Sequence, residues 1–210
     1  SQIVRSPGSF FTASLDPATG KTLYSAEIRP THGSWLEFST TRYGTITVKI
    51  DRRRKFLAST FLRALGLSDN AAIKERFAEI AGEDGKVALL EGTLQKDETT
   101  SETEALVEIF KKMHPGEPVV LDKVKEYFTN LFFNNRRYDL GAVGRYKMNK
   151  RLHTIAGFVP SEERVLTIDD IIATIACLML LEQGKGDVDD IDSLSNRRIR
   201  SVGELVATNA

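Results

Sequence analysis

The sequence predicts an α+β fold in which antiparallel strands at the N-terminus precede a mainly helical remainder. Two observations support this prediction. Up to residue 55, short segments rich in β-branched and aromatic side chains alternate with turn-forming residues. From Phe56 onward, apolar residues recur every three or four positions, which is the period of an amphipathic helix. We therefore expect a single domain over 1–210, strand-rich over 1–55 and helical over 56–210.

Four short segments are expected to be strands. They are FFTASLD (10–16), TLYSAEI (22–28), SWLEFST (34–40) and TITVKID (45–51). The DPATG, RPTHG and TRYG stretches between them are rich in residues that favour tight turns. Short turns between consecutive strands predict an antiparallel meander.

Helical patterns fill most of the remainder. Leu57, Phe61 and Leu65 recur at four-residue spacing, and AAIKERFAEIA continues the pattern. Further helices are expected over about 101–114, 120–134, 142–153 and 167–183. Residues 82–103 have the weakest periodicity and end in the most polar tract, so we expect a variable connection there, mobile or open to insertion.

The segment that begins at Thr167 is predicted to be the central core helix. Asp169 and Asp170 lie in its first turn, where negative charge suits the helix dipole, and the rest is apolar nearly all round. Cys177 lies in this segment, where a small buried hydrophobe is favoured over a nucleophile. An earlier helix begins with the capping-box pattern Ser101-x-x-Glu104.

The composition is that of an ordinary globular protein. The chain has 29 Lys+Arg and 29 Asp+Glu, and 41% of its 210 residues are hydrophobic. A protein that coats nucleic acid non-specifically carries a clear excess of basic residues, so any contact with nucleic acid must come from local clusters. The single cysteine excludes an intrachain disulfide and makes a reducing, cytoplasmic setting the default.

No membrane segment or cleavable signal is expected. The apolar run IIATIACLMLL has 11 residues, well short of the ~20 that a bilayer requires. The chain starts at Ser1 without Met and stops soon after a new helical pattern begins in VGELVATNA. We therefore expect it to be a piece of a longer protein.

Motifs for self-contained catalysis are missing from the sequence. There is no GxSxG elbow, no GxxxxGKS/T loop and no GxGxxG after a strand. The histidines His32, His114 and His153 lack metal-ligand spacing. An enzyme acting by itself is therefore poorly supported, and no cofactor is expected in this domain.

The stretch DVDDIDSLSNRRIRS, residues 187–201, gathers aspartates and then arginines. A calcium loop counted from Asp187 needs Gly at its sixth position and Glu at its twelfth, where this chain has Asp192 and Arg198. A two-carboxylate magnesium site fits the spacing, but the adjacent arginines would compete for the same oxygens. We favour an acidic loop.

Basic residues form three clusters. They are Arg52 to Lys55; a looser set of Arg136, Arg137, Arg145, Lys147, Lys150 and Arg151; and Arg197, Arg198 and Arg200. For 145–151 we favour a solvated face. Arg197 and Arg198 follow N-cap residues at 195–196 and precede a capping box at 201–204, so they either begin a helix or lie in the loop before one. Neither position explains them by local stability, so we expect them to serve a function.

Two interpretations of residues 187–201 stay open from the residues alone. Aspartates beside arginines can hold guanidinium groups in fixed directions, and an aspartate can itself accept hydrogen bonds from a base, which would make a small recognition pocket. Alternatively, the charges form an internal salt-bridge network that pins the last helix.

A resemblance to a known family bears on this choice. SQIVRSPGSFF, GSWLEF, IDRRRK, LRALGL, MHPGEP, RRYDLGAVGRYK and DVDDIDSLSNRRIRSVGEL follow one another along the whole chain. Together they resemble the β subunit of bacterial RNA polymerase, in the part called the lobe or β2 domain. Ser195 departs from the family pattern, which has glycine before NRRIRS. The resemblance implies a domain that forms one wall of the cleft holding DNA.

The resemblance also implies DNA-binding residues. A pocket that captures an unpaired non-template-strand guanine, just downstream of the start site, is matched by Arg5, Ile191, Asp192 and Arg197. Trp35 resembles a tryptophan that stacks on a neighbouring non-template base; without the family, a core tryptophan on a strand is favoured. Arg53 and Lys55 resemble an edge that contacts phosphates.

Partners follow from the same resemblance. A gate loop that faces the opposing clamp and NusG-type elongation factors is matched by Asn134, Asn135, Arg136 and Arg137. The implied partners are the non-template strand, the downstream duplex, the other polymerase subunits, and sigma and NusG-type factors, in the cytoplasm at the nucleoid. The catalytic aspartates and magnesium belong to another subunit, so this fragment is expected to be inactive alone. The alternative is a docking module for initiation or elongation factors whose DNA contact is incidental.

Overall fold

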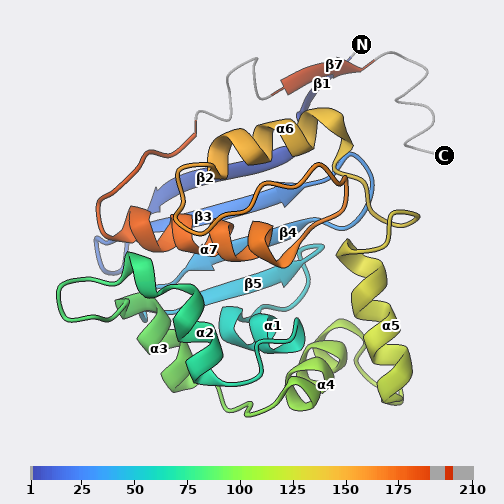
Figure 1. The fold of residues 1–210 in the computed structure, drawn as a ribbon, viewed down its shortest axis with the longest axis horizontal. Helices are drawn as coiled ribbons and strands as arrows, with labels where there is room; N and C mark the ends of the chain where they lie inside the picture. The colour runs from blue at the N-terminus through green and yellow to red at the C-terminus, as the bar shows by residue number, and fades with distance from the viewer. Residues whose placement is uncertain (1, 190–196, 201–210) are drawn as a thin grey trace.

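Strand pairing builds one main sheet and joins segments from near the two ends of the chain. The computed structural model describes residues 2–189 and 197–200, with the side chains of 6–189. The main sheet has the strand order β2-β3-β4-β5-β6, and a separate ribbon pairs β1 with β7 (Figure 1). The strands are β1 (Gln2–Arg5), β2 (Gly8–Leu15), β3 (Thr22–Arg29), β4 (Leu36–Thr40), β5 (Ile46–Ile50), β6 (Phe56–Leu57) and β7 (Arg197–Arg200). The predicted antiparallel meander is confirmed, because consecutive strands pair from β2 to β5.

Helices fill the chain between β6 and the acidic stretch. They are α1 (Ala58–Ala64), α2 (Asn70–Arg76), the 3-10 helix η1 (Ala78–Ile80), α3 (Ala88–Lys96), α4 (Glu102–Met113), α5 (Leu121–Phe132), α6 (Gly141–Leu152) and α7 (Ile168–Glu182). The last four begin and end within two residues of the predicted bounds. The predicted α+β class is therefore confirmed.

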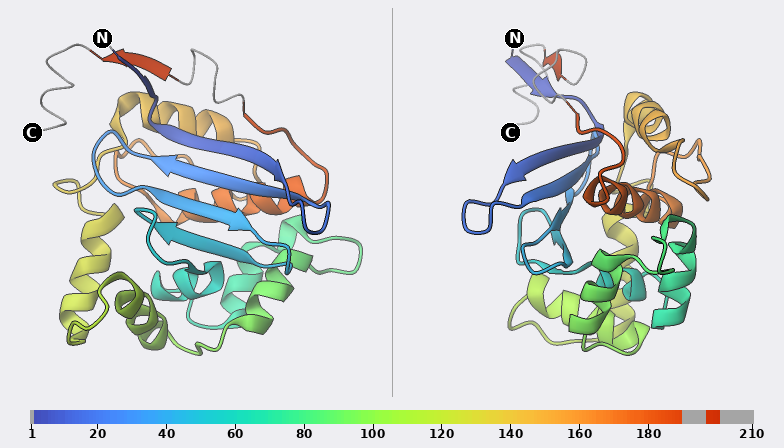
Figure 2. Two further views of the ribbon diagram at one scale, coloured as in Figure 1. Left: turned by 180° about the vertical axis from the view of Figure 1, so that it is seen from behind. Right: turned by 90° about the vertical axis from the view of Figure 1, so that its left-hand side faces the viewer.

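The helices lie to one side of the main sheet. Helix α7 packs on β3 and β4, α6 packs on β2, and α1 and α3 lie against β5 (Figure 1). In the described part of the chain no helix covers the opposite face, which is turned to the viewer in the left panel of Figure 2. Side chains on that face are partly or fully exposed at Glu27, Glu37 and Lys49, whereas Phe10 and Arg29 are buried.

Strand residues alternate between the two faces, as the period of a strand requires. One row of register partners is fully buried in the helix-covered core: Phe11, Ala26, Phe38 and Val48. The adjoining row faces the open side and is mostly charged: Phe10, Glu27, Glu37 and Lys49. A shift of one residue in register would exchange these rows, so burial of the apolar row fixes the register.

Helix α7 is the central core helix, as predicted. The Thr167 hydroxyl accepts the Asp170 N–H, and the Asp170 carboxylate accepts the Thr167 N–H at 2.8 Å, which completes a capping box. Cys177 is 7% exposed, and burial raises the pKa of its thiol to about 11. Because the thiolate is the nucleophilic form, this cysteine is an inert core residue.

A buried ion pair ties α6 to α7. The Arg145 guanidinium donates to both Asp170 carboxylate oxygens, at 2.8 and 2.9 Å, and also to the carbonyls of Glu163 and Val165. Arg145 is 5% exposed and Asp170 is fully buried. The expectation of a solvated face is therefore wrong for Arg145. Such a pair persists because hydrogen bonds satisfy both groups.

Helix α3 lies within residues 82–103, where the sequence predicts a variable connection. It buries Leu89, Leu90 and Leu94 in the core, and its Thr93 hydroxyl accepts the Ile46 N–H at 2.9 Å. A helix of nine residues is too short for its apolar positions to set up a clear period. The segment is therefore more than a bare connection over residues 88–96, and its variation in length among relatives stays a prediction.

Within the described ranges, none of the helices is both long and apolar enough to span a bilayer.

Candidate nucleic-acid interface

The sheet topology gathers residues from distant parts of the sequence at one end of the sheet. In an antiparallel sheet the end of β3, the start of β4 and the end of β5 lie together, as the pairing of Leu36 with Ile50 requires. The connections 30–35 and 51–55 therefore meet at this end, which we call the Trp35 edge. They contain Trp35, Arg53 and Lys55, so three of the DNA-binding residues that the resemblance implies lie on adjacent connections.

Trp35 is half-buried just before β4, rather than enclosed in the core. Its backbone N–H donates to the Asp51 carboxylate at 2.9 Å, and its backbone carbonyl accepts the Asp51 N–H at 3.0 Å. The Arg52 guanidinium carbon lies 5.5 Å from the indole centroid, within the range of a cation–π contact. The backbone of Trp35 is thus tied to Asp51, Arg52 lies beside the ring, and the residue stays partly exposed.

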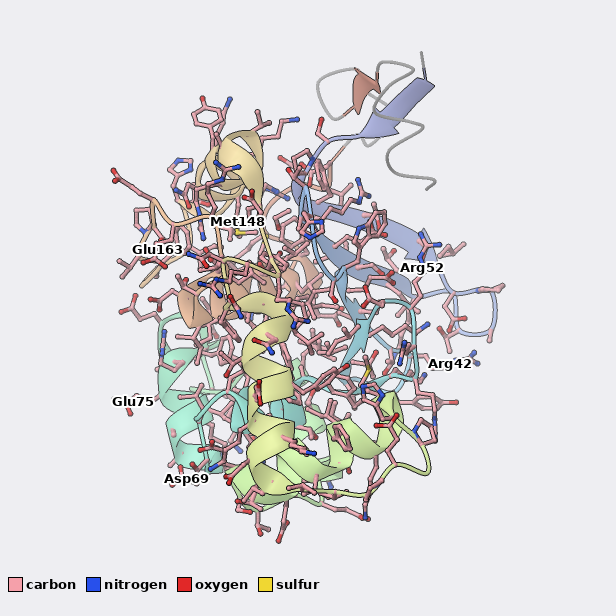
Figure 3. All side chains as sticks on the ribbon, turned by 90° about the vertical axis from the view of Figure 1, so that its right-hand side faces the viewer. Arg42, Arg52, Asp69, Glu75, Met148 and Glu163 are labelled. Atoms are coloured by element: carbon pink, nitrogen blue, oxygen red, sulfur yellow. The ribbon has the colours of Figure 1, made fainter. Side chains whose placement is uncertain are left out.

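The turn at the end of β5 has left-handed backbone at two successive residues. Asp51 has φ 51° and Arg52 has φ 59°, and the Arg53 N–H donates to the Ile50 carbonyl at 3.1 Å. Residues with positive φ in a tight turn are usually Asn, Asp or Gly, so this backbone conformation is energetically unfavourable for Arg52. The turn holds Arg52 beside Trp35, on the sheet side of the molecule in Figure 3.

Arg29 extends this arrangement and is a residue that sequence reasoning missed. It is 2% exposed, and its guanidinium carbon lies 4.6 Å from the Phe10 ring centroid and 5.7 Å from that of Trp35. Its Nε donates to the Glu27 carboxylate at 2.7 Å. The order Phe10, Arg29, Trp35, Arg52 alternates rings and cations along the open face. No motif marks Arg29, because its partners come together only through strand pairing.

Arg53 and Lys55 are both exposed on the connection from β5 to β6. The Arg53 Nη1 donates to the carbonyl of Met113 at 2.7 Å, at the last residue of α4. The Lys55 carbonyl accepts a hydrogen bond from the Lys112 Nζ at 3.3 Å. Arg53 therefore has a structural role at a helix C-terminus, where a cation is favourable, in addition to any contact with phosphate.

Residues 134–137, which match the gate loop, form a largely exposed turn that is held by hydrogen bonds at its start. Asn134 caps the loop: its side-chain oxygen accepts the Arg136 N–H at 3.0 Å and its carbonyl accepts the Arg137 N–H at 2.9 Å. Arg136 and Arg137 are exposed, as is Asn135. The loop therefore presents two cations on a fixed turn.

The base of this loop joins the Trp35 edge. His32 and Asp139 exchange backbone hydrogen bonds, and a Cβ on Gly33 would lie 2.8 Å from the Tyr138 ring. Gly33 has φ +125°, so both its conformation and this close approach require glycine. The pKa of the Asp139 carboxyl lies below its usual value. Burial alone would raise this pKa, but the hydrogen bonds from Arg164 and from the Gly141 N–H outweigh the effect of burial. The ionised carboxylate can then hold Arg164 beneath the loop.

The residues that match a guanine pocket are only partly described. Arg5 ends β1 and is the register partner of Arg197 in β7. The structure thus brings together two positions that are 192 residues apart. Ile191 and Asp192 lie outside the described residues. Residues 197–200 form a strand, so the expectation that Arg197 begins a helix or lies in a loop is wrong; pairing with β1 overrides the local capping pattern.

The described part of the acidic stretch takes part in an internal network. The Asp189 carboxylate accepts the Phe11 N–H at 2.7 Å and lies 3.5 Å from the Arg151 Nε. Arg151 also donates to the Asp187 carbonyl and covers the Phe11 ring at 4.6 Å. Asp189 thus holds this part of the chain against β2.

Among the described residues, no group of three or more His, Cys, Asp and Glu is placed to hold a metal ion.

Comparison with known proteins gives consistent matches. A family model described as RNA polymerase Rpb2, domain 2, matches residues 5–200. The chain is 44% identical over 207 residues to proteins named DNA-directed RNA polymerase subunit beta from two strains of Dehalococcoides mccartyi, BAV1 and CBDB1. The alignment covers 98% of this chain and 16% of each relative, so the chain spans about a sixth of the length of the curated relatives it matches.

Proposed function

The chain belongs to the RNA polymerase Rpb2, domain 2 family, the lobe of the bacterial β subunit, and from this premise we propose that its Trp35 edge contacts the non-template strand of DNA during transcription. The family membership confirms the resemblance found in the sequence. The relatives are named as polymerase subunits, so we further propose that the complete protein works with other polymerase subunits on DNA.

One observation supports DNA contact above the others. Trp35 is partly exposed at one end of the sheet, the Arg52 guanidinium carbon lies 5.5 Å from its ring centroid, and Lys55 is exposed on the same connection as Arg52. Grooves for single strands combine these two chemistries, because bases stack on aromatic rings and cations neutralise phosphates. The left-handed backbone at Arg52 supports the same function, because such strain is retained where it positions a functional side chain.

We propose that the register pair Arg5 and Arg197 marks the guanine pocket. The strand pairing supports this, because two arginine positions from opposite ends of the chain become neighbours in the ribbon that projects above α6 in Figure 1. Asp192 and Ile191 complete the proposed pocket, with Asp192 as the group that accepts hydrogen bonds from guanine.

A docking module for transcription factors is the second candidate. The observation that favours it is the exposed turn of residues 134–137, in which Arg136 and Arg137 project from a rigid base. Loops positioned by a rigid scaffold often carry binding residues. This surface adjoins the Trp35 edge through His32 and Asp139, so one domain offers both kinds of contact.

Salt dependence of DNA binding distinguishes the two functions. Replacing Arg53 and Lys55 with Ala in the complete polymerase should lower the slope of log K against log salt by about two, because each lost phosphate contact removes ~0.9 from it. Base preference should not change. The matched control replaces Lys123 and Lys125, two exposed lysines of α5, with Ala, and should keep the slope.

The melting temperature of the variant is measured as well, because Arg53 also donates a hydrogen bond to the last residue of α4. A lower slope in a variant that melts at the wild-type temperature supports the phosphate contact. An unchanged slope removes Arg53 and Lys55 from the DNA interface, and loss of factor binding on replacing Arg136 and Arg137 would then favour the docking module.

A further inference from the structure

A pocket lined by several charged side chains lies between β2 and α6, outside the two connections that form the Trp35 edge. It has a volume of about 400 Å³, and its walls include Ser9 of β2 and Lys147, Lys150 and Arg151 of α6. Helix and strand approach closely here, since a Cβ on Gly8 would lie 3.3 Å from the Lys147 Cβ. We call it the β2–α6 pocket.

Ser9 gives this pocket a buried hydrogen-bond donor without a partner. The residue is 4% exposed, and among the described residues its Oγ finds no hydrogen-bond partner. Buried hydroxyls are nearly always paired in folded proteins, so an unpaired one that lines a pocket points to a missing acceptor. An anionic oxygen suits a hydroxyl in a pocket whose lining includes cations.

The charges around the pocket favour an anion. Three cationic side chains line it against one carboxylate, that of Asp189. This carboxylate already accepts the Phe11 N–H at 2.7 Å and lies 3.5 Å from the Arg151 Nε, so its charge is largely compensated. Burial lowers the pKa of Lys147, because the charged ammonium loses water there.

An exposed aromatic ring lies at the same pocket. Tyr146 is 65% exposed, and the Lys150 Nζ lies 6.0 Å from its ring centroid. A large exposed ring beside cations suits a base attached to a phosphate. Ser9 follows Arg5 by four residues, which span at most ~14 Å of extended chain. A single strand at the ribbon of β1 and β7 can therefore reach the pocket.

We propose that the β2–α6 pocket binds a backbone phosphate of single-stranded nucleic acid. The Ser9 Oγ donates to a phosphate oxygen, Lys147 and Lys150 neutralise its charge, and Tyr146 stacks on the adjoining base. This inference rests on the proposed function, because it extends the path of the non-template strand from the ribbon across α6. It adds a contact at residues that the resemblance to the polymerase lobe does not single out.

The test uses complete polymerase on a bubble template in which one non-template phosphate at a time is replaced by a neutral methylphosphonate. Ser9→Ala should weaken binding about tenfold, the loss expected for a hydrogen bond to a charged group. One methylphosphonate should weaken the wild type similarly and have no further effect on the variant, since both changes remove one contact. Ser14→Ala, at an exposed position of the same strand, should behave like the wild type.

A loss of folding stability is not expected to explain weaker DNA binding by Ser9→Ala. The Ser9 hydroxyl is unpaired, so Ser9→Ala should melt no earlier than the wild type. Lys150→Ala is the second variant, because Lys150 is exposed; it should lower the salt slope by about one.

Three further outcomes overturn the proposal. If Ser9→Ala and Lys150→Ala bind every template like the wild type while Trp35→Ala binds more weakly, the β2–α6 pocket is not on the strand and the proposed function survives. If all three variants leave binding unchanged, both proposals fall. If ³¹P NMR detects Ser9-dependent binding of inorganic phosphate but no methylphosphonate alters binding, the pocket holds a free anion instead.

Discussion

Replacing Asp170 with Ala should lower the free energy of unfolding of this chain by about 3 to 5 kcal/mol, the typical cost of removing one partner from a buried ion pair. The carboxylate is fully buried and accepts both ends of the Arg145 guanidinium at 2.8 and 2.9 Å. Without it, a guanidinium that is 5% exposed keeps its charge in the core. The capping box of α7 loses its N3 side chain as well.

Urea unfolding followed by circular dichroism measures this loss, and Asp169→Ala is the matched control. Asp169 precedes Asp170 in the same turn but pairs with Arg76 at a partly exposed site. Its loss should cost about 0 to 1 kcal/mol, as for other surface ion pairs. Equal costs for the two variants would show that the link between α6 and α7 contributes little.

Replacing Asp192 with Ala in assembled polymerase should remove discrimination for guanine at one non-template position, by about 1 to 3 kcal/mol. An ionised carboxylate accepts hydrogen bonds from the donor edge of guanine, and no other base offers the same pair of donors in that geometry. Arg5 and Arg197, opposite one another in β1 and β7, are proposed to orient the base. Affinity for the remaining bases should change little.

Competition between bubble templates that differ only in that base measures the discrimination. An internal salt-bridge network predicts another result: the variant melts earlier and prefers guanine as before. Asp189→Ala is the informative comparison, because Asp189 fastens the chain to the Phe11 N–H and to Arg151. It should lower stability and leave base preference unchanged.

Local patterns were sufficient to predict most of the fold. The strands β2 to β5 and the helices α4 to α7 each contain enough residues for their period to be visible in the sequence. Helix α3 is not visible in the sequence pattern, because it has only three buried leucines over a short span. Strand β7 was assigned wrongly because Ser195 and Asn196 suggest a helix start, whereas pairing with β1 depends on residues at the other end of the chain.

The candidate site was harder to predict, because its contacts are non-local. Trp35 could be named only through the resemblance, and its partners Arg29 and Asp51 reach it through strand pairing. For Arg145, the spacing to Met148 and Leu152 puts all three on one face of α6, and this apolar face could have indicated burial. Figure 3 shows Met148 of that face beneath α6.

We propose above all that the open face at the Trp35 edge contacts the non-template strand. The most direct measurement is a structure of the complete polymerase that contains this chain, bound to an open bubble. We predict an unpaired non-template base stacked on the Trp35 ring, with the phosphate next to it near Arg52 or Lys55. A Trp35 ring covered by another protein chain, with the non-template strand passing elsewhere, would rule out this DNA contact and assign the edge to protein docking.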